Sequence, residues 1–89
     1  MKITWDERKR KKTLTLRGLD FADAGKVFEG ATFTFEDDRF DYGEKRVVTL
    51  GLLDADVVVI VHTETKKEIR IISMRKGDKD EQETYFENV

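Results

Sequence analysis

The stretch that decides the fold spans residues 57–75 and reads VVVIVHTETKKEIRIISMR. Its opening run, Val57–Thr63, is β-branched and apolar, which is typical of a central strand. The link Thr65-Lys66-Lys67 is short enough for a hairpin, and Glu68–Arg75 is a second strand that returns beside the first. The segment therefore predicts two neighbouring antiparallel strands.

Two further strands are expected before this hairpin. Ala31–Glu36 alternates apolar and polar residues, which predicts a strand with one buried face. After a turn at Asp37–Gly43, Lys45–Leu53 is the next strand, and a tight turn over residues 53–56 leads into the central strand. The four strands should therefore form an antiparallel meander.

Helices are expected on both sides of the meander in the sequence. Lys2–Trp5 reads as a short strand, and Asp6 is a good N-cap for a mostly polar helix that Gly18 ends. A second helix should run from Asp20 to Gly30, with Phe21, Ala24 and Phe28 on one buried face. A last helix opens at Asp78, with Glu81 at the capping-box position.

These elements predict one α+β domain over residues 1–89, an antiparallel β-meander sheet packed by two N-terminal helices and one C-terminal helix. No cysteine is present, no HExxH motif or phosphate-cradling glycine loop occurs, and no histidine cluster has metal spacing, so no metal or cofactor is expected. No apolar run approaches the roughly 18 residues of a membrane span, and a cytoplasmic protein is expected.

Charge is segregated along the chain. Residues 1–17 carry seven basic and two acidic side chains, and residues 45–76 carry seven and four. Residues 18–44 carry two basic and eight acidic side chains, and residues 77–89 carry one and five. The basic blocks could meet to bind RNA, or the acidic blocks could neutralise them, and composition alone does not choose.

The one histidine, His62, stands where the central apolar run gives way to polar residues. An exposed histidine there could act as a general acid or base near neutral pH, although a lone histidine at a strand end is more often structural or simply at the surface. The next strand is interrupted by Arg70 and Arg75. These arginines either face solvent from an edge strand or present a fork of donors to a phosphate.

The register of the hairpin decides which of these side chains cooperate, because a slip of one residue exchanges the faces. A two-residue turn at Lys66-Lys67 places His62 opposite Ile71 and on one face with Ser73 and Arg75. A three-residue loop places His62 opposite Arg70. The sequence is compatible with both registers.

The chain resembles the BrnT-like toxins of type II toxin-antitoxin systems over nearly its whole length. The segments that carry the resemblance are Trp5-Asp6 with Lys9, Phe21 with Ala24–Phe28, Tyr42–Arg46 with Thr49-Leu50-Gly51, Val61–Glu64, Arg70–Lys76, and Glu81 with Tyr85. The spacing between the His-Thr-Glu and Arg-Ile-Ile-Ser segments is the informative part. The chain has Leu16-Arg17-Gly18 where the family usually has Lys-His-Gly.

The resemblance implies a RelE-like fold, a ribonuclease that arrests translation, and a cognate BrnA-like antitoxin whose ribbon-helix-helix half binds operator DNA. We expect metal-independent cleavage in which the ribose 2′-hydroxyl attacks its own phosphate. Such chemistry needs a base, an acid and positive charge on the developing oxyanion. The expected roles are His62 or Glu64 for proton transfer, Arg70 and Arg75 as catalytic phosphate ligands, Arg46 and Lys76 for further RNA contacts, Glu44 and Ser73 for orientation, and Tyr85 for base stacking or simple packing.

Two other hypotheses compete with the enzyme. The first is a toxin-fold protein with little or no catalysis that binds the antitoxin as a co-repressor, which the acidic pI near 5.4 slightly favours. The second is a structural domain whose arginines serve an oligomer interface, where arginine is often enriched.

Overall fold

The computed structural model describes residues 2–38 and 43–89. The strands are β1 (Lys2–Trp5), β2 (Thr32–Asp37), β3 (Arg46–Leu53), β4 (Asp56–Glu64) and β5 (Glu68–Lys76). The helices are α1 (Glu7–Arg17), the 3-10 turn η1 (Phe21–Asp23), α2 (Ala24–Glu29) and α3 (Lys79–Asn88). The α+β class is confirmed, whereas the expected turn at Asp37–Gly43 lies partly outside the described residues, which omit 39–42.

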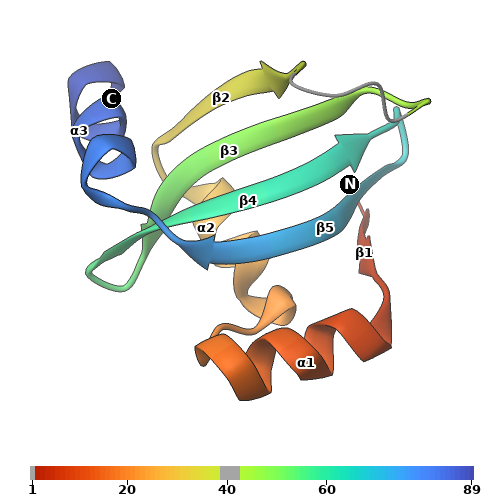
Figure 1. The fold of residues 1–89 in the computed structure, drawn as a ribbon. Helices are drawn as coiled ribbons and strands as arrows, with labels where there is room; N and C mark the ends of the chain where they lie inside the picture. Colours follow the sequence, from red (N-terminus) through yellow and green to blue (C-terminus); the bar gives the residue numbers. More distant parts are fainter. Residues whose placement is uncertain (1, 39–42) are drawn as a thin grey trace.

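The strands form one sheet in the order β1-β5-β4-β3-β2 (Figure 1). Strands β2 to β5 make the antiparallel meander that the sequence predicts. The expectation of a purely antiparallel sheet is wrong, because β1 adds a fifth strand parallel to β5, with Lys2 opposite Glu68 and Trp5 opposite Ile71. The connection from β1 to the rest of the sheet runs through both N-terminal helices.

The N-cap residues predicted from the sequence hold two of the helices at their starts. The Asp6 carboxylate accepts hydrogen bonds from the Arg8 and Lys9 amides, and Gly18 ends α1 in the left-handed conformation at φ 70°. At the C-terminal helix, Asp78 and Glu81 make both bonds of a capping box. The capping signals at Asp6, Gly18, Asp78 and Glu81 are therefore confirmed.

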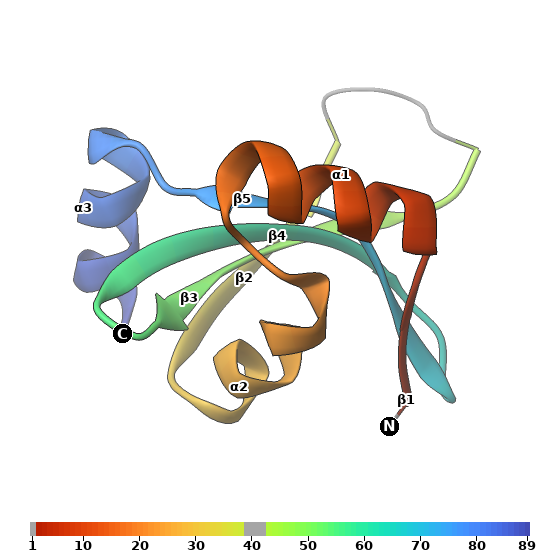
Figure 2. The same cartoon turned by 90° about the horizontal axis from the view of Figure 1, so that it is seen from below.

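The sheet has two faces, which we call the α2 face and the α3 face. On the α2 face, Val58 and Ile60 of β4 pack with residues of η1 and α2, and Figure 2 shows α1 and α2 together on that side. On the α3 face, the alternate residues Val57 and Val59 pack against Tyr85 of α3. Apolar burial on both faces makes β4 the central strand that its sequence predicts.

A β-bulge in β5 sets the faces of its polar side chains. His62 lies opposite Ile71 but Val61 lies opposite Ser73, so Ile72 is the extra residue. Ile71 and Met74 consequently both point into the core of the α2 face. Ser73 and Arg75 point to the α3 face.

Candidate active site on the α3 face

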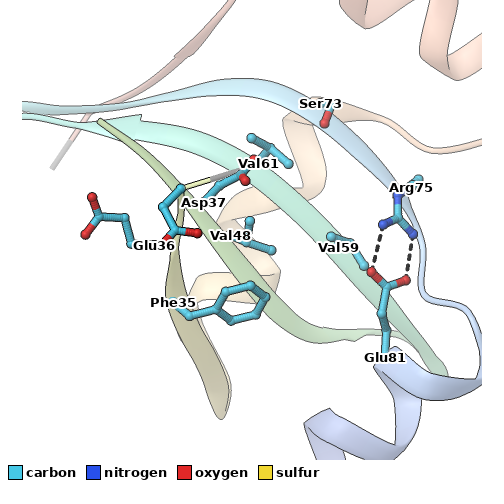
Figure 3. Close-up of a pocket in the computed structure, with 10 residues that line it drawn as sticks. Phe35, Glu36, Asp37, Val48, Val59, Val61, Ser73, Arg75 and Glu81 are labelled. Atoms are coloured by element: carbon cyan, nitrogen blue, oxygen red, sulfur yellow. Dashed lines mark hydrogen bonds and ion pairs between the residues drawn. The ribbon is translucent and has the colours of Figure 1, made fainter. Parts of the chain in front are cut away.

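A pocket of about 390 Å³ lies on the α3 face between the end of β2 and the start of α3 (Figure 3). Its floor is apolar, formed by side chains of β3 and β4, and its rim is polar. Lining side chains are Phe35, Glu36, Asp37, Asp38, Val48, Val59, Val61, Ser73, Arg75 and Glu81. Two of the residues expected at the site, Ser73 and Arg75, therefore meet at this pocket.

Arg75 is held by Glu81 through two parallel hydrogen bonds. Its Nη1 donates to Glu81 Oε1 and its Nη2 donates to Glu81 Oε2, each at 2.7 Å, and Figure 3 shows the fork closed on the carboxylate. The Arg75 guanidinium holds the pKa of the Glu81 carboxyl below its usual range. Glu81 is thus ionised at neutral pH and offsets the charge of Arg75.

The rest of the pocket rim is acidic. Glu36, Asp37 and Asp38 come from the end of β2, and Figure 3 shows Glu36 at the end of the pocket away from Arg75. Arg46 brings a second cation to this region, because it lies opposite Asp37 in the β2–β3 register. Its Nε lies 3.9 Å from a carboxylate oxygen of Glu44, which is an ion-pair distance and too long for a hydrogen bond.

Arg70 is exposed on β5 and does not line the pocket. It lies opposite Thr63, and Thr63 follows His62 on β4, so alternation along the strand puts Arg70 on the α3 face. Arg70 and Arg75 therefore share one face of the sheet, as an arginine pair that contacts RNA would require.

The expected position of His62 is wrong in two respects. Its side chain has no exposed surface, and the bulge places Ser73 and Arg75 on the opposite face even though the two-residue hairpin turn forms. Thr65 N donates to Glu68 O at 2.9 Å, as that turn requires. The extra residue in β5 separates the histidine from the arginines, a feature that the turn length alone does not reveal.

His62 is buried in the core of the α2 face, where a threonine lies within hydrogen-bond distance of its Nε2. Its Nε2 lies 2.7 Å from Thr49 Oγ1, and Thr49 Oγ1 lies 2.9 Å from Thr34 Oγ1, which makes a polar chain across three strands. The ring meets Phe28 edge to face, and Nδ1 lies 3.5 Å from Glu64 Oε1. Burial lowers the pKa of His62, so the neutral imidazole is favoured.

Two further expected site residues lie away from the pocket interior. Lys76 follows Arg75 on the strand, so its side chain starts from the other face, and its Nζ lies 3.5 Å from an Asp56 oxygen. Tyr85 is 2% exposed and donates from Oη to the Ala31 carbonyl at 2.9 Å, so it packs against the sheet instead of offering a ring for stacking. The exposed aromatic ring of α3 belongs to Phe86.

A family model described as "Ribonuclease toxin, BrnT, of type II toxin-antitoxin system" matches residues 5–81. The chain belongs to the BrnT family. No curated protein matches the chain. The family match means that this BrnT chain is a ribonuclease toxin of a type II toxin-antitoxin system, with RNA as substrate and an antitoxin as partner.

The matched region contains strands β2 to β5 and ends at Glu81, the residue that pairs with Arg75. Among residues 2–38 and 43–89 of this BrnT chain, no group of three or more histidine or acidic side chains is arranged to hold a metal ion. In the same part of the chain, no helix is long and apolar enough to cross a membrane.

Sequence reasoning missed how the carboxylates of this BrnT chain surround its arginine. Glu81 was recognised as a capping residue, but its second role requires α3 to fold back over the end of β5. The sequence predicted only a turn from Asp37 onward, whereas Asp37 is 7% exposed and lines the pocket. The signal in the sequence was the acidic block of residues 18–44, which precedes two strands that carry arginines, β3 and β5.

Proposed function

We propose that this BrnT chain is a metal-independent endoribonuclease that binds the scissile phosphate in the α3-face pocket and inhibits translation by cleaving RNA. The observation that carries this proposal is the Arg75 guanidinium at the pocket rim, in the fork geometry that suits a phosphate. A RelE-like fold and a BrnA-like antitoxin with a ribbon-helix-helix half remain part of the proposal, as the family resemblance implies.

In the proposed reaction, the ribose 2′-hydroxyl gives its proton to a base as its oxygen attacks the adjacent phosphorus, and the bond to the 5′-oxygen breaks as that oxygen takes a proton from water. The products are a 2′,3′-cyclic phosphate and a 5′-hydroxyl end. Arg75 exchanges its carboxylate partner for the phosphate and stabilises the charge that develops there. Ser73 offers a hydroxyl to the same group, and Arg46 and Arg70 bind neighbouring phosphates on the same face.

Glu81 is the proposed base, because it is the carboxylate in contact with Arg75 and is set free when phosphate takes its place. We assign no proton transfer to His62 or Glu64. An imidazole without exposed surface is out of reach of RNA, and Glu64 follows it by two residues on the same face of β4. Their proposed role is to stabilise the sheet that carries the arginines.

The test is cleavage of a defined RNA by the purified chain in the presence of a metal chelator, compared with Arg75→Ala and Lys76→Ala. Loss of an oxyanion-type donor lowers a rate by about 10²–10³-fold. We expect that loss for Arg75→Ala and a cyclic phosphate product. Lys76→Ala is the matched control, since its side chain starts from the other face. Equal activity of a folded Arg75→Ala variant and the parent chain would refute the site.

The acidic pocket rim supports a second candidate function. Four carboxylates, from Glu36, Asp37, Asp38 and Glu81, line the pocket beside Arg75, and a phosphate must compete with them. The alternative is therefore a chain with weak catalysis that acts through its antitoxin as a co-repressor module. Absence of RNA cleavage from folded parent chain, together with retained antitoxin binding, would select this alternative.

A further inference from the structure

The outer surface of α1 carries a dense positive charge that the pocket chemistry does not use. This helix has no buried residue, and Glu7 is its only acidic residue beside six basic ones. Arg10 is neutralised by Glu7 and Asp20. Within residues 2–38 and 43–89, no ion pair neutralises the exposed Lys9 and Lys12.

Some of these basic side chains line a groove between α1 and β5. Lys9, Lys12 and Arg17 line it from the helix, at the spacing of one helical stripe, together with the 70% exposed Leu16. Ile72 and Ser73 line it from β5. Arg17 Nη1 donates to the Met74 carbonyl at 3.1 Å, which fixes its guanidinium at the margin of the strand.

This groove and the α3-face pocket meet at one residue. Ser73 lines both of them. Strand β1 pairs with β5 as far as Ile71, and beyond this point no strand of the described residues 2–38 and 43–89 borders β5 on that side, where α1 lies (Figure 2). The bulge residue Ile72 comes directly after that point and contributes its side chain to the groove. A single strand can therefore pass from the groove over the margin of β5 into the pocket.

We propose that this α1 groove is a backbone-binding track that holds an RNA strand next to the cleaved phosphate. The proposal rests on the proposed ribonuclease function and adds the surface that supplies its affinity. The pocket rim carries more carboxylates than cations, so the positive field needed for a polyanion must come from outside it. RNA is favoured over an acidic protein because the track leads directly into the arginine pocket.

The test measures binding of the full chain to a 2′-O-methyl RNA oligonucleotide, which cannot be cleaved through its 2′-oxygen. We compare Lys9→Gln/Lys12→Gln with Arg8→Gln/Lys11→Gln, which removes the same charge from the same helix outside the groove. Each phosphate contact with a single strand contributes about 0.7 to the slope of log K against log salt. Losing both track lysines should lower the slope by about 1.4 and weaken binding roughly 25-fold at about 0.1 M salt.

The control pair should change the affinity only a few-fold. Equal weakening by both pairs would show a diffuse field without a track and would overturn the proposal. Unchanged RNA affinity in the track variant would also overturn it, including the case in which that variant loses antitoxin binding and the groove proves to be a protein contact. Cleavage of ordinary RNA is measured separately, so a chain that binds through the track but does not cleave would sink the proposed function and leave the track standing.

Discussion

Replacing Glu81 with glutamine separates the two tasks of this side chain. Glu81 Oε1 accepts from Arg75 Nη1 at 2.7 Å and from the Asp78 amide at 2.9 Å, while Oε2 accepts from Arg75 Nη2 at 2.7 Å. Glutamine has the same length and keeps one oxygen, so the capping box survives. The variant Glu81→Gln therefore removes the charge and one bond of the arginine fork without removing the helix cap.

The expected cost follows from the exposure of the two partners. A hydrogen bond to a charged group contributes about 1.5–3 kcal/mol, but exposed pairs contribute about 0–1 kcal/mol. Side-chain exposure is 44% for Arg75 and 25% for Glu81, which places this pair between those cases. We expect a loss of about 1 kcal/mol, which lowers the melting temperature of a domain of this size by about 4–8 °C.

The pH dependence identifies the cause of that loss. Arg75 lowers the pKa of Glu81 below its ordinary 4.5, so the folded state favours the carboxylate. This contribution is fully present above the unfolded pKa and disappears as the pH falls through the folded pKa. The difference in the free energy of unfolding between the parent chain and Glu81→Gln should therefore be present at pH 7 and disappear on acidification below about pH 4.5. Glu83→Gln, on the same helix and exposed, is the control.

The same variant tests the proposed chemistry. Removing the Glu81 charge frees Arg75 for phosphate, so binding of non-cleavable RNA should tighten while the cleavage rate falls, because the base is lost. A stability gap of the same size at pH 7 and pH 3 would show that the ion pair is not its source. RNA binding that weakens in Glu81→Gln would refute the idea that this carboxylate competes with phosphate.

Three other changes should have measurable effects. His62→Ala should lower the free energy of unfolding, measured with denaturant, by about 2–4 kcal/mol through a cavity and a lost hydrogen bond. Because burial lowers the pKa of His62, the parent chain should also lose stability as the pH falls below the unfolded value near 6.5. This dependence of stability on pH should be weaker in the variant. Gly51→Ala should cost about 1–3 kcal/mol, since a Cβ would lie 2.5 Å from the buried Val27 Cγ1; unchanged thermal stability would contradict this. The antitoxin should slow amide exchange across residues 70–76, where the arginines lie, and unchanged exchange there would place its contact elsewhere.

The sequence was a good guide wherever one local rule decided the structure. The β-branched run Val57–Thr63 marked the central strand, and Asp6 and Asp78 marked helix starts through their carboxylates. Each of these signals depends on residues that are close in the chain. The predictions made from these local signals are therefore confirmed in the three-dimensional structure.

The errors arose where contacts between residues far apart in the sequence decided the structure. His62 was a candidate for proton transfer because it stands where an apolar run gives way to polar residues, but it is buried and its Nε2 lies 2.7 Å from Thr49 Oγ1 of the neighbouring strand. Parallel pairing of β1 with β5 joins residues more than 60 positions apart, which a pass along the chain does not detect. The charge of Arg75 was counted as available because its partner Glu81 belongs to another element.

The bulge in β5 explains why the arginine segment can serve the core and the site together. In a regular strand, Ile71 and Ser73 would share one face, and Met74 would share the other with Ile72. With Ile72 as an extra residue, Ile71 and Met74 both enter the core of the α2 face, while Ser73 and Arg75 are turned toward α3. The same residue brings Ser73 to the margin between pocket and groove. One inserted position thus reconciles apolar burial with a polar site, which fits the tendency of bulges to lie beside functional residues.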